Sequence, residues 1–345
     1  MSVRLGYGLL TCQRHPDDTR PDAARYAEAL ALAERAEGIG LDSVWTSEHH
    51  FVDDAYMSAQ LPVLAAIAAR TSRITIGSGL YLLPLYEPLH AAEDAATVDL
   101  LAGGRLVLGL GLGWRAEEFE ALGLRIGDRV RRLEAGMTVL RQAWTEPWLV
   151  VGDGEVFRYR QVNVTPHPAR PGGPPLWIGA LAEPAVRRAG RIADGFMATE
   201  ADPTAFGEQV RWALEELDRS GRDPSTFSIS IHRPVFTWRG GDPWRLVAPY
   251  HWYTTWKYDD MDGARSRTST VPVPPIPGDR KAALRADLLA GTPEQVADGI
   301  AAYARAAGVP VHFIARSYYP GLDPAIQAET LDLLGEVGAL LRGPR

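Results

Sequence analysis

Apolar runs of strand length alternate with helical patterns along the whole chain, and this alternation limits the possible folds more than any other feature. The strand-like runs lie at 3–10, 41–45, 73–82, 105–113, 175–180, 194–199, 227–236 and 311–315. They read as continuous apolar runs, which is typical of parallel strands covered by helices. Helices are expected at 21–40, 58–70, 88–102, 117–123, 129–145, 183–192, 203–219, 292–307 and 324–342. Eight strand–helix units predict a closed α/β barrel, the (β/α)8 TIM barrel, rather than an open doubly wound sheet.

Two segments interrupt the alternation within what we expect to be one domain over 1–345. Residues 147–174 include GDGEVFRYRQVNVTPHP, which indicates a small hairpin inserted into the barrel. Residues 239–291 are rich in Pro, Trp and Arg and have no clear period. An irregular segment of that length in a compact domain is usually functional or mobile. A lid over the barrel and an oligomer contact both remain open for it.

Composition excludes several classes of protein. The 345 residues carry a net charge of −7 in mixed signs, without the concentrated basic face that nucleic acid or an anionic membrane requires. The single cysteine, Cys12, excludes an internal disulfide and a multi-cysteine metal site. No apolar run approaches the roughly 20 residues of a membrane span, and the first residues lack the organisation of a signal peptide. A cytoplasmic protein is the expectation.

Three ionisable residues, Glu48, His49 and His50, follow the second predicted strand in the stretch WTSEHHFVDD. Catalytic groups of a TIM barrel lie on the loops after the strands. If the backbone stays extended, Glu48 and His50 face one side and His49 the other. Histidine and glutamate are also zinc ligands, but no other His, Asp or Glu pair has recognisable ligand spacing, so no metal is expected. A solvated loop with incidental histidines is the alternative.

Small residues mark the next two strand ends. GSGL includes Ser78, Gly79 and Leu80, and small residues there allow a flat ligand or another backbone to come close. GLGLGW includes Gly111 and Leu112 and opens a helix as a dinucleotide fingerprint would, but it lacks the third glycine at the required spacing. Close backbone packing at the barrel rim is the other interpretation.

Two further segments are candidates for anion binding. Arg129 and Arg132 open a predicted helix, where cations do not favour the helix dipole, so a bound anion or plain solvation would explain them. The segment IGALAEPAVRR places Ala180, Leu181 and Ala182 before another helix. Free backbone amides at such a helix start can bind a phosphate.

Three stretches together resemble the bacterial luciferase-like monooxygenase superfamily: VWTSEHHF, LPLYEPLHAAEDAATVDLLAGGRLVLGLGLGWRAEEFEALG and GTPEQVADGIAAYARAAGV. The resemblance extends over nearly the whole chain and keeps the order and spacing of the stretches. It implies a barrel that binds reduced FMN or the deazaflavin F420 at its C-terminal mouth. The Glu-His-His form is similar to that of flavin monooxygenases, whereas F420 members more often have Asp-His.

The resemblance also implies roles for individual residues. His49 corresponds to the catalytic histidine of the family, with Glu48 and His50 beside it. Gly79 and Leu80 correspond to a pair joined by a non-proline cis peptide against the flavin ring.

Two positions depart from the luciferase pattern. Gly111 stands where luciferase has a reactive, non-essential cysteine. Leu112 replaces a phosphate-binding arginine, so Arg129 or Arg132, with amides of 180–183, is expected to compensate.

The function implied is that of a two-component flavin monooxygenase. A separate reductase would supply reduced FMN, and one oxygen atom of O2 would be inserted into a small organic substrate. F420-dependent hydride transfer on the same barrel is the first alternative. A non-catalytic flavin-binding partner is the second, against which the retention of both His49 and His50 argues. A homodimer is expected.

Overall fold

Eight parallel strands form a closed barrel in the computed structural model, which describes residues 2–151, 156–199, 201–262 and 272–343. Strand β1 pairs with β2 on one side and with β11 on the other, and the β8–β9 pairing completes the ring. The strands in order around the barrel are β1 (Val3–Leu10), β2 (Ser43–Thr46), β3 (Thr75–Ser78), β4 (Leu106–Leu110), β7 (Leu176–Ala180), β8 (Gly195–Thr199), β9 (Ser228–Thr237) and β11 (Val311–Arg316). The predicted TIM barrel is confirmed.

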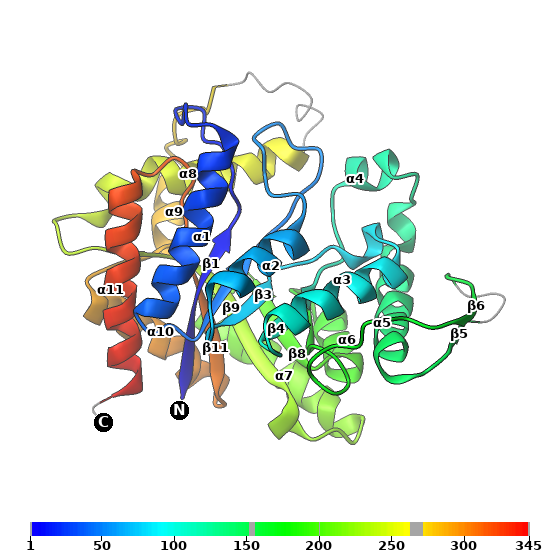
Figure 1. Cartoon of the computed structure of the whole chain (residues 1–345). Helices are drawn as coiled ribbons and strands as arrows, with labels where there is room; N and C mark the ends of the chain where they lie inside the picture. Colours follow the sequence, from blue (N-terminus) through cyan, green and yellow to red (C-terminus); the bar gives the residue numbers. More distant parts are fainter. Residues whose placement is uncertain (1, 152–155, 200, 263–271, 344–345) are drawn as a thin grey trace.

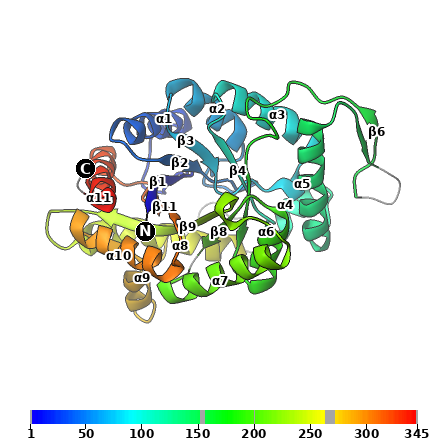
Figure 2. The ribbon, with the colours of Figure 1, turned by 90° about the horizontal axis from the view of Figure 1, so that it is seen from below.

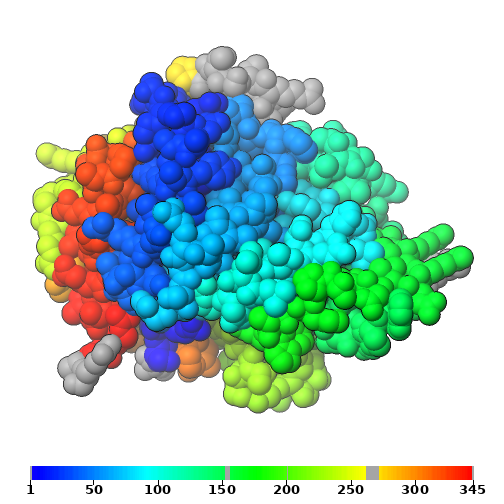
Figure 3. All heavy atoms as spheres, viewed as in Figure 1, coloured from blue at the N-terminus to red at the C-terminus, as the bar shows by residue number. Residues whose placement is uncertain are grey.

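Helices surround the barrel and cover its strands (Figure 2). They are α1 (Asp22–Gly38), α2 (Gln60–Arg70), α3 (Pro88–Leu101), α5 (Arg129–Thr145), α6 (Glu183–Ile192), α7 (Pro203–Arg219), α10 (Pro293–Ala307) and α11 (Pro324–Arg342). On the face shown in Figure 3, residues of α1, α2, α3 and α11 lie over the strands. The short helix α4 (Ala116–Ala121) lies near the C-terminal ends of the strands (Figure 1).

Two tryptophans and a histidine fill the barrel interior. The rings of Trp45 and Trp177 stack with centroids 5.3 Å apart, and the His312 ring meets both edge-on. Ser43 Oγ lies 2.6 Å from His312 Nε2 and accepts the indole hydrogen of Trp45 at 2.7 Å. Burial and the nearby Arg4 lower the pKa of His312 to about 3, so this imidazole is neutral and belongs to the core.

The first predicted insertion is a hairpin. Strands β5 (Leu149–Val151) and β6 (Tyr159–Val162) pair antiparallel between α5 and β7. The hairpin extends beyond the ring of helices (Figure 2) and exposes Trp148 and Val150. The described residues of this insertion thus pair as a hairpin, while 152–155 lie outside them.

The second insertion is more regular than its composition indicates. It contains α8 (Pro243–Asp262), α9 (Lys281–Asp287) and β10 (Leu289–Gly291), which pairs with β9. Pro249 lies inside α8 and obscures the helical pattern, because proline usually breaks a helix. The pattern is present nonetheless, since Trp244, Val247, Ala248 and Trp252 recur at helical spacing and are buried together against the barrel. Residues 263–271 lie outside the described residues.

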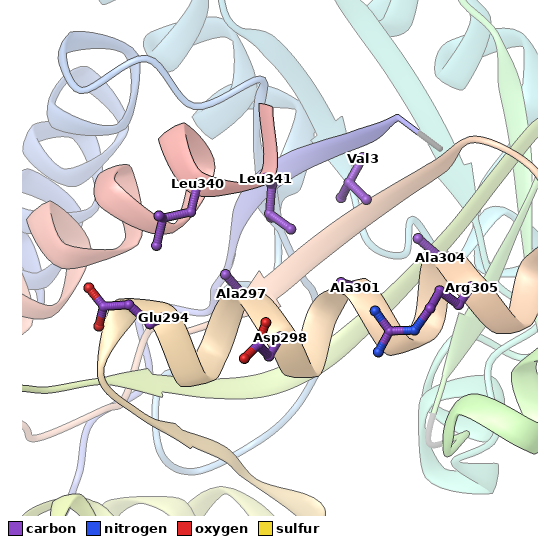
Figure 4. Close-up of a pocket in the computed structure, with 9 residues that line it drawn as sticks. All are labelled: Val3, Glu294, Ala297, Asp298, Ala301, Ala304, Arg305, Leu340 and Leu341. Atoms are coloured by element: carbon purple, nitrogen blue, oxygen red, sulfur yellow. The ribbon is translucent and has the colours of Figure 1, made fainter. Parts of the chain in front are cut away.

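A groove of about 480 Å³ lies on the outer wall of the barrel, between α10, α11 and the start of β1 (Figure 4). Its walls combine alanines of α10 with Leu340 and Leu341 of α11, and Glu294, Asp298 and Arg305 provide its charges. TIM-barrel active sites are built at the C-terminal ends of the strands. This outer groove is therefore separate from the expected site.

Gly77 tests the packing of the barrel interior. A Cβ at Gly77 would lie 2.3 Å from a ring carbon of Trp45, so Gly77→Ala is expected to lower the free energy of unfolding by about 1–3 kcal/mol. Gly38, at the end of α1, has open space around its Cα, so Gly38→Ala should leave stability unchanged or slightly higher. Urea denaturation measures both variants. Equal stability of the two would contradict this account of the core.

Candidate active site

The loop after β2 places its three ionisable side chains on two sides, as extended backbone requires. His50 Nε2 lies 3.9 Å from Glu48 Oε1, and both side chains lie within hydrogen-bond distance of the Tyr86 hydroxyl. His49 faces the opposite way, toward Glu118 on α4. The predicted alternation is confirmed. All three residues lie at the C-terminal mouth of the barrel, where α4 and α8 cover the strand ends (Figure 1).

Glu48 is a buried carboxylate with several donors. Oε1 accepts the Leu82 backbone N–H at 2.7 Å, and Oε2 accepts the Tyr86 hydroxyl at 3.3 Å. Burial lowers the pKa of His50, but the nearby Glu48 carboxylate and the charge of Glu118 outweigh burial, so the net shift is upward. Glu48 and His50 thus form a polar pair that fixes the loop against the segment after β3.

The second pair, His49 and Glu118, is more deeply enclosed. His49 Nδ1 lies 3.0 Å from Glu118 Oε1, which also accepts the His50 backbone N–H at 2.9 Å. The Arg115 guanidinium lies 3.5 Å from the same oxygen and donates to the His50 carbonyl at 2.7 Å. Burial raises the pKa of Glu118, but the hydrogen bond and charge of His49, the His50 amide and Arg115 outweigh it and lower the pKa. An ionised Glu118 therefore holds the His49 ring by Nδ1.

Aromatic rings enclose His49 on its remaining sides. Tyr56, Tyr258 and Trp114 all meet the imidazole edge-on, with centroid distances of 4.9, 5.4 and 5.8 Å. The hydroxyl oxygens of Tyr56 and Tyr258 lie 3.2 Å apart, and only Trp114 among the three is substantially exposed. His49 is 5% exposed, so this acid–base group is largely shielded from bulk water.

The small residues of β3, β4 and β7 surround Leu80. The Gly79–Leu80 peptide bond is cis, as expected. A Cβ at Gly111 would lie 3.0 Å from Leu80 Cβ, and one at Gly179 would lie 2.1 Å from Leu80 Cδ1. The Ser78 hydroxyl donates to the Gly109 carbonyl at 2.9 Å. Close backbone packing therefore accounts for part of the glycine pattern, with Leu80 lying across two neighbouring strand ends.

The two predicted anion-binding arginines have protein partners. Arg129 donates to the Ile126 carbonyl at 3.0 Å. Arg132 donates to the Pro84 carbonyl at 2.7 Å, and its guanidinium lies 4.9 Å from the centroid of Phe157. Both side chains therefore brace neighbouring segments.

The start of α6 is more open. Its N-cap, Ala182, makes no side-chain cap hydrogen bond, and both Leu181 and Ala182 are exposed. Ala180 is the last residue of β7, and half-buried Leu112 follows the end of β4. Free amides at this position suit an anion.

Sequence reasoning missed Glu118, Arg115, Tyr86 and Tyr258. Glu118 and Arg115 lie in GWRAEEFEALG, which follows the fourth strand and so reaches the same mouth as His49. That shared position was an available signal. Nothing in the local pattern distinguishes Glu118 from Glu117, because only the folded contacts show that Glu118 alone is fully buried.

Two features are absent from the part of the chain that the structure describes. No group of three His, Cys, Asp or Glu side chains there is arranged to hold a metal ion. No described helix combines the length and apolarity needed to cross a membrane.

A TIM barrel with polar side chains gathered at its C-terminal mouth is the usual scaffold of an enzyme. The chain belongs to the luciferase-like monooxygenase family, whose model matches residues 3–309. The family resemblance that the sequence indicated is confirmed.

Relatives in this family use different cofactors. The chain is 34% identical over 231 residues to an F420-dependent glucose-6-phosphate dehydrogenase of Nakamurella multipartita, covering 64% of this chain and 63% of that protein. It is 29% identical over 209 residues to 4-hydroxyprotoasukamycin monooxygenase of Streptomyces nodosus subsp. asukaensis, covering 60% and 54%. The chain thus matches less than two thirds of the length of either relative.

A solved structure shows the same fold. The oxygenating constituent of 3,6-diketocamphane monooxygenase from Pseudomonas putida, in complex with FMN, superposes with a TM-score of 0.74 at 19% identity. The match covers 97% of both chains.

Glu118 links pH to stability at this site. The pKa of Glu118 in the folded protein lies below its unfolded value of about 4.3. Its ionised carboxylate therefore contributes fully to the free energy of unfolding above about pH 4.3, and this contribution is lost as the pH falls through the folded-state pKa. Gln cannot ionise, so the stability gap between wild type and Glu118→Gln should be largest at pH 7 and shrink below about pH 4.3. Urea unfolding at several pH values measures the gap.

Glu117→Gln, on the same helix but only partly buried, is the matched control for loss of a carboxylate on α4. A stability gap for Glu118→Gln that stays constant from neutral to acid pH would contradict the assignment of an ionised, tightly held Glu118.

Proposed function

We propose that the protein is the oxygenating component of a two-component flavin monooxygenase. It would accept reduced FMN from a separate reductase and use O2 to oxygenate a small organic substrate. The observation that carries this proposal is the buried His49–Glu118 pair with its aromatic neighbours, at the same end of the barrel as the Gly79–Leu80 segment that follows β3. Family membership and the FMN-bound oxygenating constituent with the same fold support it.

The residues present fit a flavin. Leu80 lies across the glycines of two strand ends, which leaves an apolar floor without projecting side chains at those positions. Ser78, Gly79, Leu80 and Gly111 would support the ring system. Leu112 and Ala180 would line its edge, and the free amides at the start of α6, Leu181 and Ala182, would bind the phosphate. When bound, the reduced flavin supplies the electrons and the reaction with oxygen.

The chain itself would contribute placement, proton transfer and exclusion of water. Glu118 holds His49 by Nδ1, so Nε2 is the ring nitrogen that would exchange a proton with the reacting groups. Imidazole is suited to this task near neutral pH. Glu48 and His50 would hold the loop through Tyr86 rather than react. The rings around His49 would keep water from competing for the proton.

F420-dependent hydride transfer is the second candidate. A histidine held by a carboxylate also suits removal of a proton from a substrate hydroxyl while hydride leaves the adjacent carbon. The relative that is 34% identical to this chain is named for such a reaction.

Oxygen dependence separates the two candidates. Turnover with reduced FMN that requires O2 supports the monooxygenase, whereas anaerobic turnover with F420 supports hydride transfer. Thermal shift with FMN, reduced FMN and F420 shows which cofactor binds, because a ligand at 100 times its dissociation constant adds about 2.7 kcal/mol of stability. If neither reduced FMN with O2 nor F420 supports turnover, both candidates are overturned.

His49→Ala should lower the oxygenation rate by about 10²–10⁴-fold, the usual contribution of general acid–base catalysis. FMN affinity should remain nearly unchanged, because the imidazole is held by Glu118 and is not part of the glycine floor. Single-turnover rates and FMN titration measure the two effects.

His50→Ala is the matched control and should be milder, since His50 contacts Glu48 and Tyr86. Full activity of His49→Ala together with an inactive His50→Ala would reverse the assignment within the pair.

A further inference from the structure

Helix α8 lies over the mouth of the barrel and contacts the loop that carries His49 (Figure 1). Three of its side chains make these contacts: Tyr253, Lys257 and Tyr258. None of them comes from the strands or loops that the family motifs mark. The contacts therefore raise the question of what α8 does for the site.

Lys257 anchors the helix. Lys257 is 4% exposed, and its ammonium group donates to Asp53 at 2.6 Å and to Asp260 at 2.9 Å. Burial lowers the pKa of Lys257, but the hydrogen bonds to the two carboxylates outweigh burial and raise it. A buried charge is tolerated only when it is paired in this way. The contact to Asp53 therefore joins α8 to the loop that carries His49.

Tyr253 makes a second tie one helical turn earlier. Its hydroxyl donates to Asp54 Oδ2 at 2.8 Å, and the same oxygen accepts the Gln13 side-chain amide at 2.9 Å. Asp54 is buried and its Oδ1 accepts the Tyr56 backbone N–H at 3.1 Å. Two adjacent carboxylates of the loop are thus bonded to α8, which fixes the helix in register with it.

With α8 held in this position, Tyr258 lies against His49. Its ring meets the imidazole edge-on at 5.4 Å and lies roughly parallel to Trp114, 27° apart in plane. Its hydroxyl lies 3.2 Å from that of Tyr56, and the Arg316 guanidinium lies 5.6 Å from its ring centroid. Tyr258 is therefore itself held from several directions.

A hydrogen bond at one ring nitrogen sets the tautomer and the general orientation of an imidazole, and packing against the ring limits its remaining motion. The His49 ring is attached to the backbone through Cβ and held at Nδ1 by Glu118, so the motion left to it is a limited rocking of the ring. Edge-on rings on the other sides restrict that motion. Tyr56 and Trp114 come from the barrel loops, whereas Tyr258 comes from α8 and adds the third contact.

We propose that Tyr258 is a positioning residue for His49 and that the Lys257–Asp53 ion pair sets its place. The role in turnover rests on the proposed function, in which His49 transfers the proton. The structural role does not, and it is measurable in the protein alone.

The structural test uses Tyr258→Leu, which keeps apolar bulk but removes the aromatic edge contact, and Tyr258→Phe, which keeps the ring. Imidazole ¹⁵N NMR, with the His49 signals assigned from His49→Ala, should show one sharp Nδ1–H tautomer in wild type and Tyr258→Phe. Tyr258→Leu should give broadened or averaged His49 signals. Unchanged signals in Tyr258→Leu would overturn the proposal, whether or not any cofactor supports turnover.

The ion pair is tested by hydrogen exchange over residues 47–57. Lys257→Met should increase exchange there, because it leaves Asp53 without its buried partner. The chain has one other lysine, exposed Lys281, and Lys281→Met is the matched control that should exchange like wild type. Exchange at the wild-type rate in Lys257→Met would overturn the anchoring role.

The catalytic test is a double-mutant cycle with whichever cofactor supports turnover. Tyr258→Leu should lower kcat about 10- to 100-fold, as a small misplacement of a catalytic group does, with a smaller change in KM. Tyr258→Phe should stay within about threefold of wild type, since it retains the ring. In the His49→Ala background Tyr258→Leu should have no further effect. An equal loss in both backgrounds would show that Tyr258 acts independently of His49 and would overturn the proposal.

Discussion

The site depends on the burial of one carboxylate. Glu118 is fully enclosed, and such a charge is costly unless donors surround it. His49, the His50 backbone amide and Arg115 provide them, and each comes from a loop at the barrel mouth. These contacts all fall on Oε1, while Oε2 is buried and has no hydrogen-bond partner among the described residues. Through Oε1 the carboxylate joins the loop after β2 to the segment after β4. It also selects the ring nitrogen of His49 that remains available for chemistry.

The residues that pack the barrel interior and the residues of the candidate site lie at different depths along the barrel axis. The interior is closed by stacked Trp45 and Trp177 with a neutral His312, and glycine at position 77 leaves room for the indole. The ionisable side chains of the candidate site lie above this layer, where backbone amides and tyrosine hydroxyls are available to them. A packed lower layer gives the mouth a rigid base, which a histidine that must keep its orientation requires.

The sequence predicted the parts whose signals are local. Apolar strand runs located all eight strands of the barrel, and extended backbone geometry separated His49 from Glu48 and His50. Helix α8 was missed because Pro249 and the surrounding aromatic residues obscured its period. Glu118 was missed for a different reason: its burial is a tertiary property that adjacent Glu117 does not share. Sequence thus locates the loops of this site, and the fold decides which of their charges meet.

The choice of basic residues has a practical consequence. Only two of the 36 lysines and arginines are lysines, and one of them, Lys257, is buried between carboxylates. Arginine is always protonated and does not compete for amine-directed reagents near neutral pH. Mild acylation will therefore reach exposed Lys281 while sparing Lys257, the anchor of α8. Lys281 is therefore a selective side-chain amine for attaching a dye, a surface or a tether.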